Sequence, residues 1–417
     1  MNFEKMLKPF ECKCGMTHSC DIKQVIISSG AVNSLKSVLG DYKKILLVAD
    51  NNTYGICGTV VEEQLADRLE STLIYQRDGI LVPNEEAVCE MQEKLTEETE
   101  LIIGLGSGVI QDLCKYVSFE AKVPYYIIAT APSMDGYASK GAAMIAENMK
   151  ITYNAHVPEV IIGDVDILKD APMDMIRSGY GDILGKYSCL NDWKLSRVIL
   201  DEYFCDYVYD LTYEMLLKTK DLGEKLQQRD ANAIQTLMEA LVGVGIAMAY
   251  VGNSRPASGS EHHMSHFFEV TGILNGEEYF MHGIDVVYSA VYTQKLREAL
   301  IAMDKPTPRA QLTKAEWEQK IRAIYTEAAE GVIALQNKLG WYERNLQPVY
   351  DTKWEEIKTV LKEVPSSEEL IGYLKSVGLD IADFEKLYGT EKIEDAILYA
   401  KDLKDRFSVL WVNYFIG

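Results

Sequence analysis

The first part of the chain alternates short apolar runs with amphipathic stretches. Residues 60–70, 85–95 and 109–120 repeat apolar side chains three and four positions apart, which is typical of amphipathic helices. β-branched runs separated by such helices predict an α/β fold with a parallel, doubly wound sheet. The expected strands are QVIIS, KKILLVA, STLIYQ, ELIIGLG, PYYIIAT and PEVIIGD, all between about residues 22 and 165.

After about residue 170 the β-rich runs stop and long helical patterns follow. These patterns cover residues 211–226, 231–251 and 317–338, and shorter, charged helices are expected from about Tyr350. With 417 residues and 47% apolar composition, the chain can form two cores. We therefore expect a Rossmann-like dinucleotide-binding α/β domain over residues 1–170 and an all-helical metal- and substrate-binding domain over residues 171–417.

The formal net charge of −21 argues against a nucleic-acid partner, because the chain has no basic excess to neutralise phosphates. A small anionic substrate would need local cations or helix N-termini. The N-terminus lacks the charged start and apolar run of a signal peptide, and the pattern predicts no membrane insertion. We expect a cytoplasmic protein whose eight cysteines are mostly free thiols.

Four candidate metal ligands lie within nine residues near the N-terminus: Cys12, Cys14, His18 and Cys20. Their spacing, C-x-C-x3-H-x-C, is not among the common zinc patterns, which join two ligand pairs across a longer loop. An ordinary N-terminal segment is the favoured interpretation. Metal or redox chemistry stays open as the alternative.

A glycine-rich loop, Gly104-Leu-Gly-Ser-Gly108, joins the expected strand ELIIGLG to a helix. Backbone N–H groups and the helix dipole at such a loop can approach a pyrophosphate closely. The spacing departs from G-x-G-x-x-G and the loop follows a later strand, so a plain tight turn is the alternative.

Asp50 ends the expected strand KKILLVA. A carboxylate at the end of a strand can accept the ribose hydroxyls of NAD, and it would repel the 2′-phosphate of NADP. We therefore expect NAD, with NADP as the alternative. A solvated Asp that opens a turn is the structural alternative.

The loop TAPSMDGYAS follows the expected strand PYYIIAT and gathers Thr130, Ser133, Asp135 and Ser139. Hydroxyls and a carboxylate beyond the carboxyl end of a strand lie where open α/β sheets bind ligands. An ordinary polar loop has a similar composition, so the composition alone does not decide between them.

Three of the six histidines lie within five residues, in SGSEHHMSH, and a fourth is His282. The spacing of Ser258 and Glu261 predicts a capping box, so a helix would begin there and present His262 and His266 on one face. Two imidazoles on one helical face suit a metal site. Because neutral imidazoles leave the charge of a divalent cation uncompensated, a carboxylate should complete the set.

Asp182, in GYGDILGKYS, is the candidate carboxylate, with a helix N-cap or surface acid as the alternative. Arg255 precedes the expected histidine helix and could bind a substrate phosphate beside the N-terminus of that helix. An ordinary salt bridge of Arg255 is the alternative, and Lys186 and Lys140 are competing cations.

Together these motifs resemble the glycerol-1-phosphate dehydrogenases, especially their bacterial branch, within the superfamily of iron alcohol dehydrogenases and dehydroquinate synthases. The resemblance spans the chain to about residue 340. It rests on the order of five motifs, GSGVIQD, TAPSMDGYAS, GYGDILGKYS, SGSEHHMSH and MHG.

The resemblance implies reversible NAD(P)H-linked reduction of dihydroxyacetone phosphate to sn-glycerol 1-phosphate at a divalent cation, with zinc favoured over nickel. We also expect a homo-oligomer. Another polyol dehydrogenase or a dehydroquinate synthase-like enzyme is the nearest alternative, and a non-catalytic nucleotide-binding regulator is a more remote one. The implied metal ligands are Asp182, His262 and His282; Asp182 and His266 are the implied catalytic residues; Asp135, Asp182 and His266 would contact substrate; and Gly106, Ser107, Gly108, Val109, Ile110, Thr130, Ser133 and Ser139 would hold the dinucleotide.

Overall fold

The computed structural model describes residues 1–77, 79, 81–146 and 149–416. The chain divides into two compact units. The first contains residues 1–180 and 224–252, and the second contains residues 181–223 and 253–417. From the sequence we expected a cofactor-binding domain up to residue 170 and a metal-binding domain after it. This functional assignment stays a prediction, because the two units are defined by their internal contacts.

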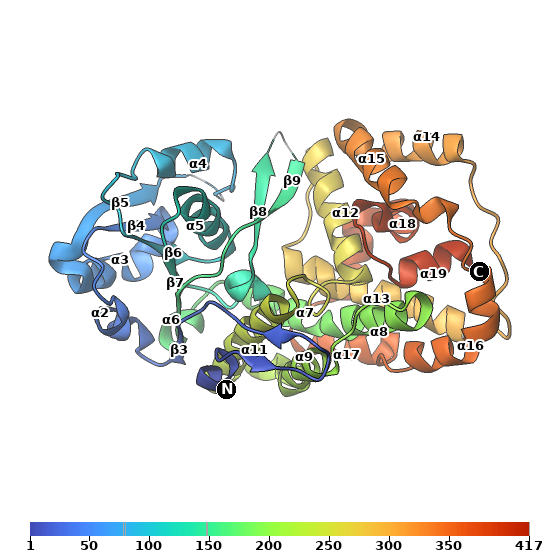
Figure 1. Ribbon diagram of the computed structural model, residues 1–417, viewed down its shortest axis with the longest axis horizontal. Helices are drawn as coiled ribbons and strands as arrows, with labels where there is room; N and C mark the ends of the chain where they lie inside the picture. Colours follow the sequence, from blue (N-terminus) through green and yellow to red (C-terminus); the bar gives the residue numbers. More distant parts are fainter. Residues whose placement is uncertain (78, 80, 147–148, 417) are drawn as a thin grey trace. The chain divides into compact units, whose positions relative to one another are not determined.

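A parallel sheet forms the centre of the first unit. In the described part of the chain it has six strands in the order β3-β10-β7-β6-β4-β5, and every neighbouring pair is parallel (Figure 1). All six strands expected from the sequence are present. They are β3 (Gln24–Ser28), β4 (Ile45–Asp50), β5 (Leu69–Tyr75), β6 (Leu101–Gly106), β7 (Tyr125–Ala129) and β10 (Val160–Asp164).

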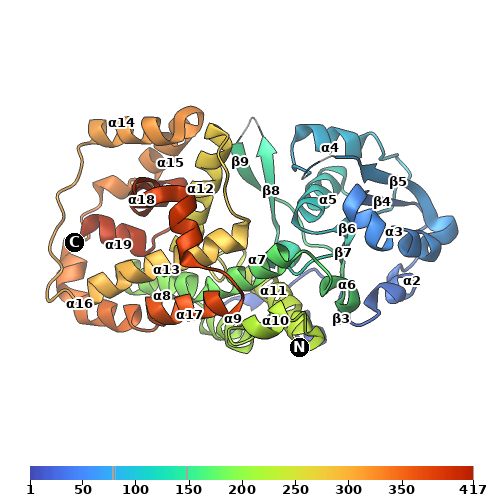
Figure 2. The same cartoon turned by 180° about the vertical axis from the view of Figure 1, so that it is seen from behind.

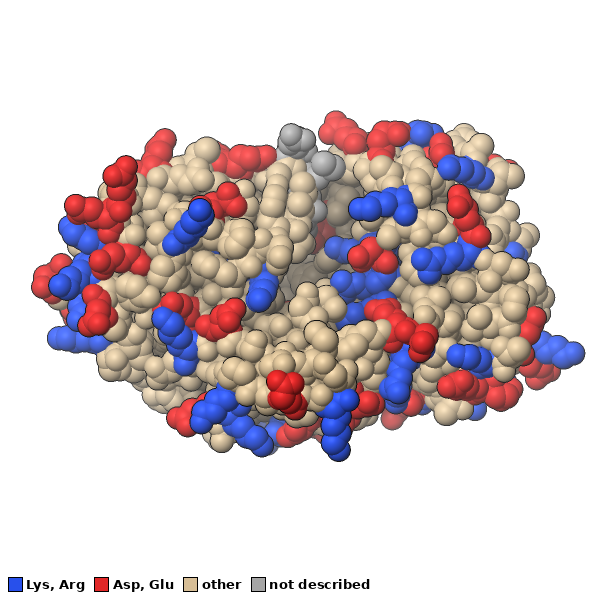
Figure 3. All heavy atoms as spheres, viewed as in Figure 1, with Lys and Arg blue, Asp and Glu red and all other residues tan. Residues whose placement is uncertain are grey.

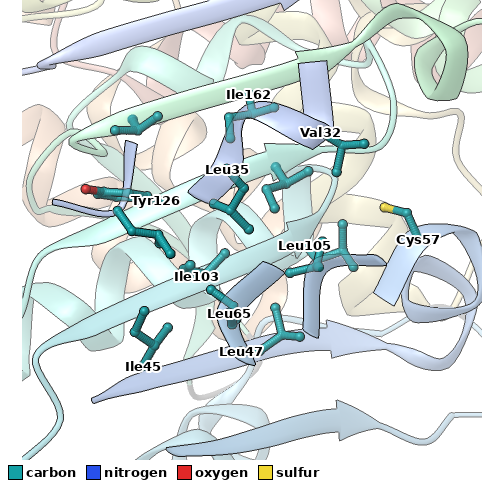
Figure 4. Packing of buried hydrophobic residues seen from close by; sticks show 14 of the residues in the cluster. Val32, Leu35, Ile45, Leu47, Cys57, Leu65, Ile103, Leu105, Tyr126 and Ile162 are labelled. Atoms are coloured by element: carbon teal, nitrogen blue, oxygen red, sulfur yellow. The ribbon is translucent and has the colours of Figure 1, made fainter. Parts of the chain in front are cut away.

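Helices cover both faces of this sheet. Alternate residues of β4, β6, β7 and β10 form one apolar cluster with α2 and α3, which Figure 4 shows around Leu47, Leu65 and Ile103. Successive strand residues point to opposite faces, so Gly104 faces the other side, where it contacts Ile110 and Cys114 of α5. Helix α11 packs on that second side through Met238, which approaches Gly163. The sheet is therefore doubly wound, as expected.

The remaining elements of the first unit are mostly short. Two antiparallel hairpins, β1–β2 and β8–β9, were not expected from the sequence. The elements are α1 (Phe3–Met6), β1 (Phe10–Glu11), β2 (Thr17–His18), η1 (Ala31–Ser34), α2 (Leu35–Val38), α3 (Asn51–Leu65), η2 (Ala66–Arg68), α4 (Glu85–Gln92), α5 (Gly108–Ala121), η3 (Asp135–Ala138), β8 (Gly141–Ala146), β9 (Met149–Asn154), α6 (Val165–Leu168) and α11 (Ala231–Val251).

The second unit is helical over its described residues, apart from an isolated bridge between Pro308 and Ile416 (Figure 2). Two helices reach the boundary between the units, α7 (Met173–Leu184) and α10 (Gly223–Gln227). The others are α8 (Lys186–Leu200), α9 (Asp206–Thr219), α12 (Ser260–Asn275), α13 (His282–Ile301), α14 (Lys314–Tyr325), η4 (Thr326–Ala328), α15 (Ala329–Leu339), η5 (Trp341–Glu343), α16 (Gln347–Leu361), α17 (Ser367–Ser376), α18 (Ile381–Tyr399), η6 (Ala400–Leu403) and α19 (Val409–Phe415).

Three of the expected helices have different bounds in the structure. For the helix expected over residues 60–70 the bounds are wrong, because α3 begins after the Asp50 cap and ends at Leu65, and Leu69 already opens β5. The stretch 211–226 is divided between α9 and α10. The stretch 317–338 is interrupted at Thr326, whose φ of 41° ends α14.

Helix α11 is long and apolar enough to cross a membrane by length and composition, and it is the one such helix among the described residues. Most of its apolar window, 72%, is buried inside the structure. Core helices of soluble proteins have the same properties.

On the face shown in Figure 3, Lys and Arg side chains are interspersed with Asp and Glu side chains.

Candidate active site

The strand order places Asp50 and the glycine loop on neighbouring strands. From β4 the chain moves to β5 on one side, and then to β6 on the other side of β4, so the strand order reverses between β4 and β6. Ala49 pairs with Leu105, which leaves Asp50 and Gly106 as the next residues at the carboxyl ends. Ligands of open α/β sheets bind at this kind of switch point. The position supports the expected dinucleotide site.

The start of α5 is arranged for a close approach of the backbone. In the described structure the Ser107 side chain does not cap the first turn of the helix, which begins at Gly108. A Cβ on Gly106 would lie 2.6 Å from the Ile110 side chain, and one on Gly108 would lie 3.2 Å from Met134 Sδ. These glycines therefore serve close packing around the loop, while the N–H groups of α5 stay suited to a pyrophosphate.

Asp50 itself caps α3. Its Oδ1 accepts hydrogen bonds from the N–H groups of Asn52 and Thr53, at 2.8 and 2.7 Å, and the Thr53 hydroxyl completes a capping box. The structural alternative for Asp50 is thus present. Capping through Oδ1 does not exclude ribose binding, which stays a prediction.

A buried lysine that was not singled out from the sequence, Lys115, donates hydrogen bonds to the backbone of the TAPSMDGYAS loop and of the residue pair that follows it. Lys115 is fully buried on α5, and its ammonium donates to the carbonyls of Gly136 and Gly141 at 3.0 and 2.7 Å. Burial lowers the pKa of Lys115. Ser139 Oγ lies 3.4 Å from this ammonium, and the Thr130 N–H donates to the Gly106 carbonyl. The loop is therefore fixed beside the glycine loop.

The other two loop residues are also placed by backbone packing. Ser178 Oγ donates to the Ser133 carbonyl, and a Cβ on Gly179 would lie 1.9 Å from the Pro132 carbonyl oxygen. Asp135 is buried at the start of η3. The roles of Ser133 and Asp135 toward cofactor and substrate stay predictions.

In the second unit, three helices bring Asp182, His262 and His282 together. Each offers one ligand atom, and the three atoms lie within 4.8 Å of one another. The rings of His262 and His282 have centroids 5.1 Å apart, and Asp182 Oδ1 lies 3.6 Å from His262 Nε2. Asp182 comes from α7, His262 from α12, and His282 is the first residue of α13.

The approach of α7 to α13 depends on two glycines. A Cβ on Gly181 would lie 2.2 Å from the Gly283 carbonyl oxygen and 3.0 Å from Val287 Cγ1. The absence of a side chain at Gly181 lets the backbones touch. This contact lies next to both Asp182 and His282, so it sets their separation.

Glu261 orients His262. Its Oε1 lies 2.6 Å from His262 Nδ1 and accepts the Gly259 N–H at 2.9 Å. Because a carboxylate can only accept, Nδ1 carries the proton and the Nε2 lone pair points toward Asp182. A carboxylate behind a histidine is the usual support of a metal ligand. The expected capping box is wrong, since α12 starts at Ser260 with Gly259 as its N-cap.

Asp182 is fully buried in the last turn of α7, which excludes both alternatives, the N-cap and the surface acid. Lys186 Nζ donates to Asp182 Oδ1 at 2.7 Å and to the Ala257 carbonyl at 2.9 Å. Burial opposes ionisation of Asp182, but the Lys186 ammonium holds the pKa of this carboxyl well below its usual range. The donor set is one anionic oxygen and two imidazoles, which fits a divalent cation.

Known proteins resemble this chain over most of its length. Residues 26–172 match the family of iron-containing alcohol dehydrogenases. A Geobacillus thermodenitrificans protein named glycerol-1-phosphate dehydrogenase (NAD(P)+) is 31% identical over 333 residues, which cover 78% of this chain and 82% of the relative. The chain belongs to the glycerol-1-phosphate dehydrogenase family. A relative of the same name from Halalkalibacterium halodurans is 28% identical over 96% of this chain and 94% of its own length.

Solved structures confirm the fold of this glycerol-1-phosphate dehydrogenase family member. A probable glycerol dehydrogenase from Sinorhizobium meliloti has a TM-score of 0.62 at 15% identity, covering 94% of this chain and 92% of its own. A sulfoacetaldehyde reductase from Bifidobacterium kashiwanohense, solved with NAD+, has a TM-score of 0.61 at 12% identity, covering 96% and 98%. The resemblance inferred from the five motifs and the α/β-plus-helical architecture are both confirmed.

A second group of ligand atoms in this family member shares His282. His266, Glu269 and His282 also offer atoms within 4.8 Å of one another, and the rings of His266 and His282 have centroids 5.5 Å apart. His266 thus lies beside the first group, and its contact with substrate stays a prediction. Glu269 was not singled out from the sequence. His263 is buried, and its side chain is in neither group.

Arg255 is buried and forms an ion pair with Glu202, whose side chain is partly exposed. Its Nε donates to Glu202 at 2.7 Å, its Nη1 donates to the Phe407 carbonyl at 2.8 Å, and its Nη2 also contacts Glu202. These contacts favour the alternative of a structural salt bridge. Phosphate binding by Arg255 stays a prediction.

A buried network, also missed from the sequence, supports the start of α12. Asp192 Oδ2 accepts the Ser260 N–H at 2.7 Å, and its Oδ1 accepts Arg297 Nη2 at 2.7 Å and the Val409 N–H at 2.9 Å. Asp192 and Arg297 are fully buried. This carboxylate therefore caps the helix that carries His262.

Proposed function

We propose that this chain catalyses the reversible NAD(P)H-linked reduction of dihydroxyacetone phosphate to sn-glycerol 1-phosphate at a divalent cation. The observation that carries the proposal is the convergence of Asp182, His262 and His282, with Glu261 fixing the tautomer of His262. Membership of the glycerol-1-phosphate dehydrogenase family and the names of the relatives supply the substrate.

The side chains of Asp182, His262 and His282 are suitable ligands for a divalent cation. A divalent cation, when bound, supplies a Lewis acid that stabilises negative charge on the substrate oxygen. Asp182 contributes the negative charge of the ligand set, and Glu261 keeps the His262 lone pair directed at the site. His266, beside His282, would hold the proton that is exchanged with the C2 oxygen, while Asp135 would orient the substrate hydroxyls.

The dinucleotide would lie at the carboxyl ends of β4, β6 and β7. The N–H groups at the start of α5 would hold its pyrophosphate, and Thr130, Ser133 and Ser139 would line it. We propose NAD as the preferred cofactor and zinc as the preferred metal, with NADP and nickel as alternatives. The proposal also includes a cytoplasmic homo-oligomer that binds no nucleic acid.

The assay that tests the function follows loss of NADH absorbance on addition of dihydroxyacetone phosphate to the metal-loaded protein. We expect turnover, and in the reverse direction oxidation of sn-glycerol 1-phosphate but not of sn-glycerol 3-phosphate. Unphosphorylated dihydroxyacetone and glycerol serve as matched controls for a general polyol dehydrogenase. Equal turnover with and without the phosphate would contradict the proposed substrate.

Replacing Asp50 by serine is expected to narrow the preference for NADH over NADPH by about tenfold, or about 1.4 kcal/mol. The reason is that the change removes a negative charge near the 2′-phosphate. Serine is also a good N-cap, so α3 should keep its cap. The ratio of kcat/KM for the two cofactors measures the effect.

The charge-matched control for this change is Asp67→Ser, at an exposed position of the same unit. It should leave the cofactor ratio unchanged. Equal use of both cofactors by the unmodified enzyme would remove the proposed role of Asp50.

The contacts of Arg255 predict a structural effect of Arg255→Ala. The change removes the hydrogen bonds from Arg255 to Glu202 and to the Phe407 carbonyl, so we expect the free energy of unfolding to fall by about 2 kcal/mol. The KM values for dihydroxyacetone phosphate and dihydroxyacetone should then change equally. A KM increase confined to the phosphorylated substrate would instead assign the phosphate to Arg255.

A further inference from the structure

The N-terminal hairpin gathers three of the four candidate ligands singled out near the start of the chain. β1 pairs with β2 so that Phe10 lies opposite His18. The Cys12 N–H donates to the Met16 carbonyl and the Gly15 N–H donates to the Cys12 carbonyl, both at 3.0 Å. This turn, in which Gly15 has a φ of 88°, places Cys14 on the same side as Cys12 and His18.

The ligand atoms of Cys12, Cys14 and His18 lie within 4.8 Å of one another. In a tetrahedral zinc site, Zn–S bonds of about 2.3 Å and Zn–N bonds of about 2.0 Å separate the ligand atoms by roughly 3.5 Å. Cys14 Sγ and His18 Nε2 are already 3.4 Å apart. Small side-chain movements would therefore complete the geometry.

His18 is held as a metal-ligating histidine would be. Its Nδ1 lies 2.9 Å from the Tyr250 carbonyl, which can only accept, so Nδ1 carries the proton and the Nε2 lone pair faces Cys14. The imidazole is fully buried and stacks on the Tyr250 ring at a centroid distance of 5.4 Å. A backbone carbonyl that fixes the second nitrogen is a common support of zinc-bound histidine.

Cys20, the fourth candidate in the sequence, is not part of this group. Burial raises the pKa of its thiol to about 11, so it stays protonated at neutral pH. Cys12 and Cys14 are each partly exposed, which gives a cation access to their sulfur atoms. Thiolates with an imidazole are a donor set that selects zinc.

We propose that Cys12, Cys14 and His18 bind a structural zinc ion, separate from the Asp182, His262 and His282 site. Binding forms two Zn–S bonds and one Zn–N bond and releases the two thiol protons to solvent, with no change of oxidation state. The tetrahedron keeps one position for a further ligand. The ion fastens the hairpin to the end of α11, because His18 is bonded to Tyr250.

Metal analysis of the purified full-length protein tests the proposal. We expect zinc bound at the hairpin in addition to the cation of the proposed catalytic site, so that His282→Ala retains one zinc per chain. Adding Cys14→Ser to His282→Ala should remove this zinc. Cys89→Ser, at an exposed thiol of the same unit, is the matched control and should leave it in place.

Cobalt substitution provides a second readout that does not depend on enzymatic activity. Cobalt in the His282→Ala protein should show near-ultraviolet thiolate-to-metal charge transfer. Of the two proposed sites, the hairpin site is the one with sulfur ligands. Cys12→Ser should weaken this absorption, whereas Cys89→Ser should not. A His282→Ala protein without bound zinc and without this absorption would overturn the proposal. Loss of activity with an intact hairpin signal would bear on the proposed function alone.

Discussion

Replacing His282 by alanine is expected to remove the catalytic cation and to lower kcat/KM for dihydroxyacetone phosphate by about 10³-fold or more, which is about 4 kcal/mol. His282 is common to both groups of ligand atoms in the second unit, so either group loses a ligand. Its position as the first residue of α13 makes the truncation mild for the fold. Occupancy of this site and activity should therefore fall together, and the thermal stability of the protein measured without the cation at this site should change little.

Metal content and activity also show which group of ligand atoms binds the cation: Asp182, His262 and His282, or His266, Glu269 and His282. If the cation is held by Asp182, His262 and His282, His262→Ala should lose metal. Glu269→Gln should retain it, and His266→Ala should retain metal while losing turnover. Retention of metal by His262→Ala together with its loss in Glu269→Gln would move the site to the second group. Full turnover by a His282→Ala protein that has lost this cation would remove metal catalysis from the proposal.

The second large effect is expected for Gly181→Ala. The added methyl group would lie 2.2 Å from the Gly283 carbonyl oxygen, and neither backbone has a flexible end that can move away. We expect the free energy of unfolding to fall by about 3 kcal/mol, and α13 to shift away from α7. Since this shift separates His282 from Asp182, metal affinity should fall as well.

Gly372→Ala is the matched control for this prediction. Gly372 lies in α17 of the same unit, and a Cβ there meets no atom within 4 Å. Because alanine favours a helix over glycine, this variant should gain about 0.5–1 kcal/mol. Equal melting temperatures and equal metal content in the two variants would show that the close approach at Gly181 is not required.

The central sheet could be predicted because its strands are buried on both faces and therefore read as continuous apolar runs, as in ILLVAD and LIIGLG. Strand β8 of the hairpin β8–β9 reads GAAMIA, which has only one β-branched residue, and the hairpin was missed. The break at Thr326 was missed for a similar reason, because no glycine or proline marks it. Apolar patterns in the sequence thus predicted the strands of the central sheet, but they did not predict the point at which a helix is broken.

The grouping of the candidate ligands was predicted, but their surroundings were not. Motif resemblance named Asp182, His262 and His282 as candidates, and the fold brings them together from positions up to 100 residues apart. Spacing along one helix misplaced the cap of α12, because the start of that helix is set by Asp192, distant in sequence. The supporting roles of Glu261 and Lys115 depend on tertiary contacts that a single sequence does not contain.

The contacts of Asp192 also join three segments that are far apart in the chain. Its carboxylate accepts hydrogen bonds from the Ser260 N–H, from Arg297 and from the Val409 N–H. While any of these segments is unfolded, the buried charge lacks one of its hydrogen bonds, which is costly in a dry interior. The helix that carries His262 should therefore reach its final position only after all three segments have folded, so the proposed cation site should form late in refolding.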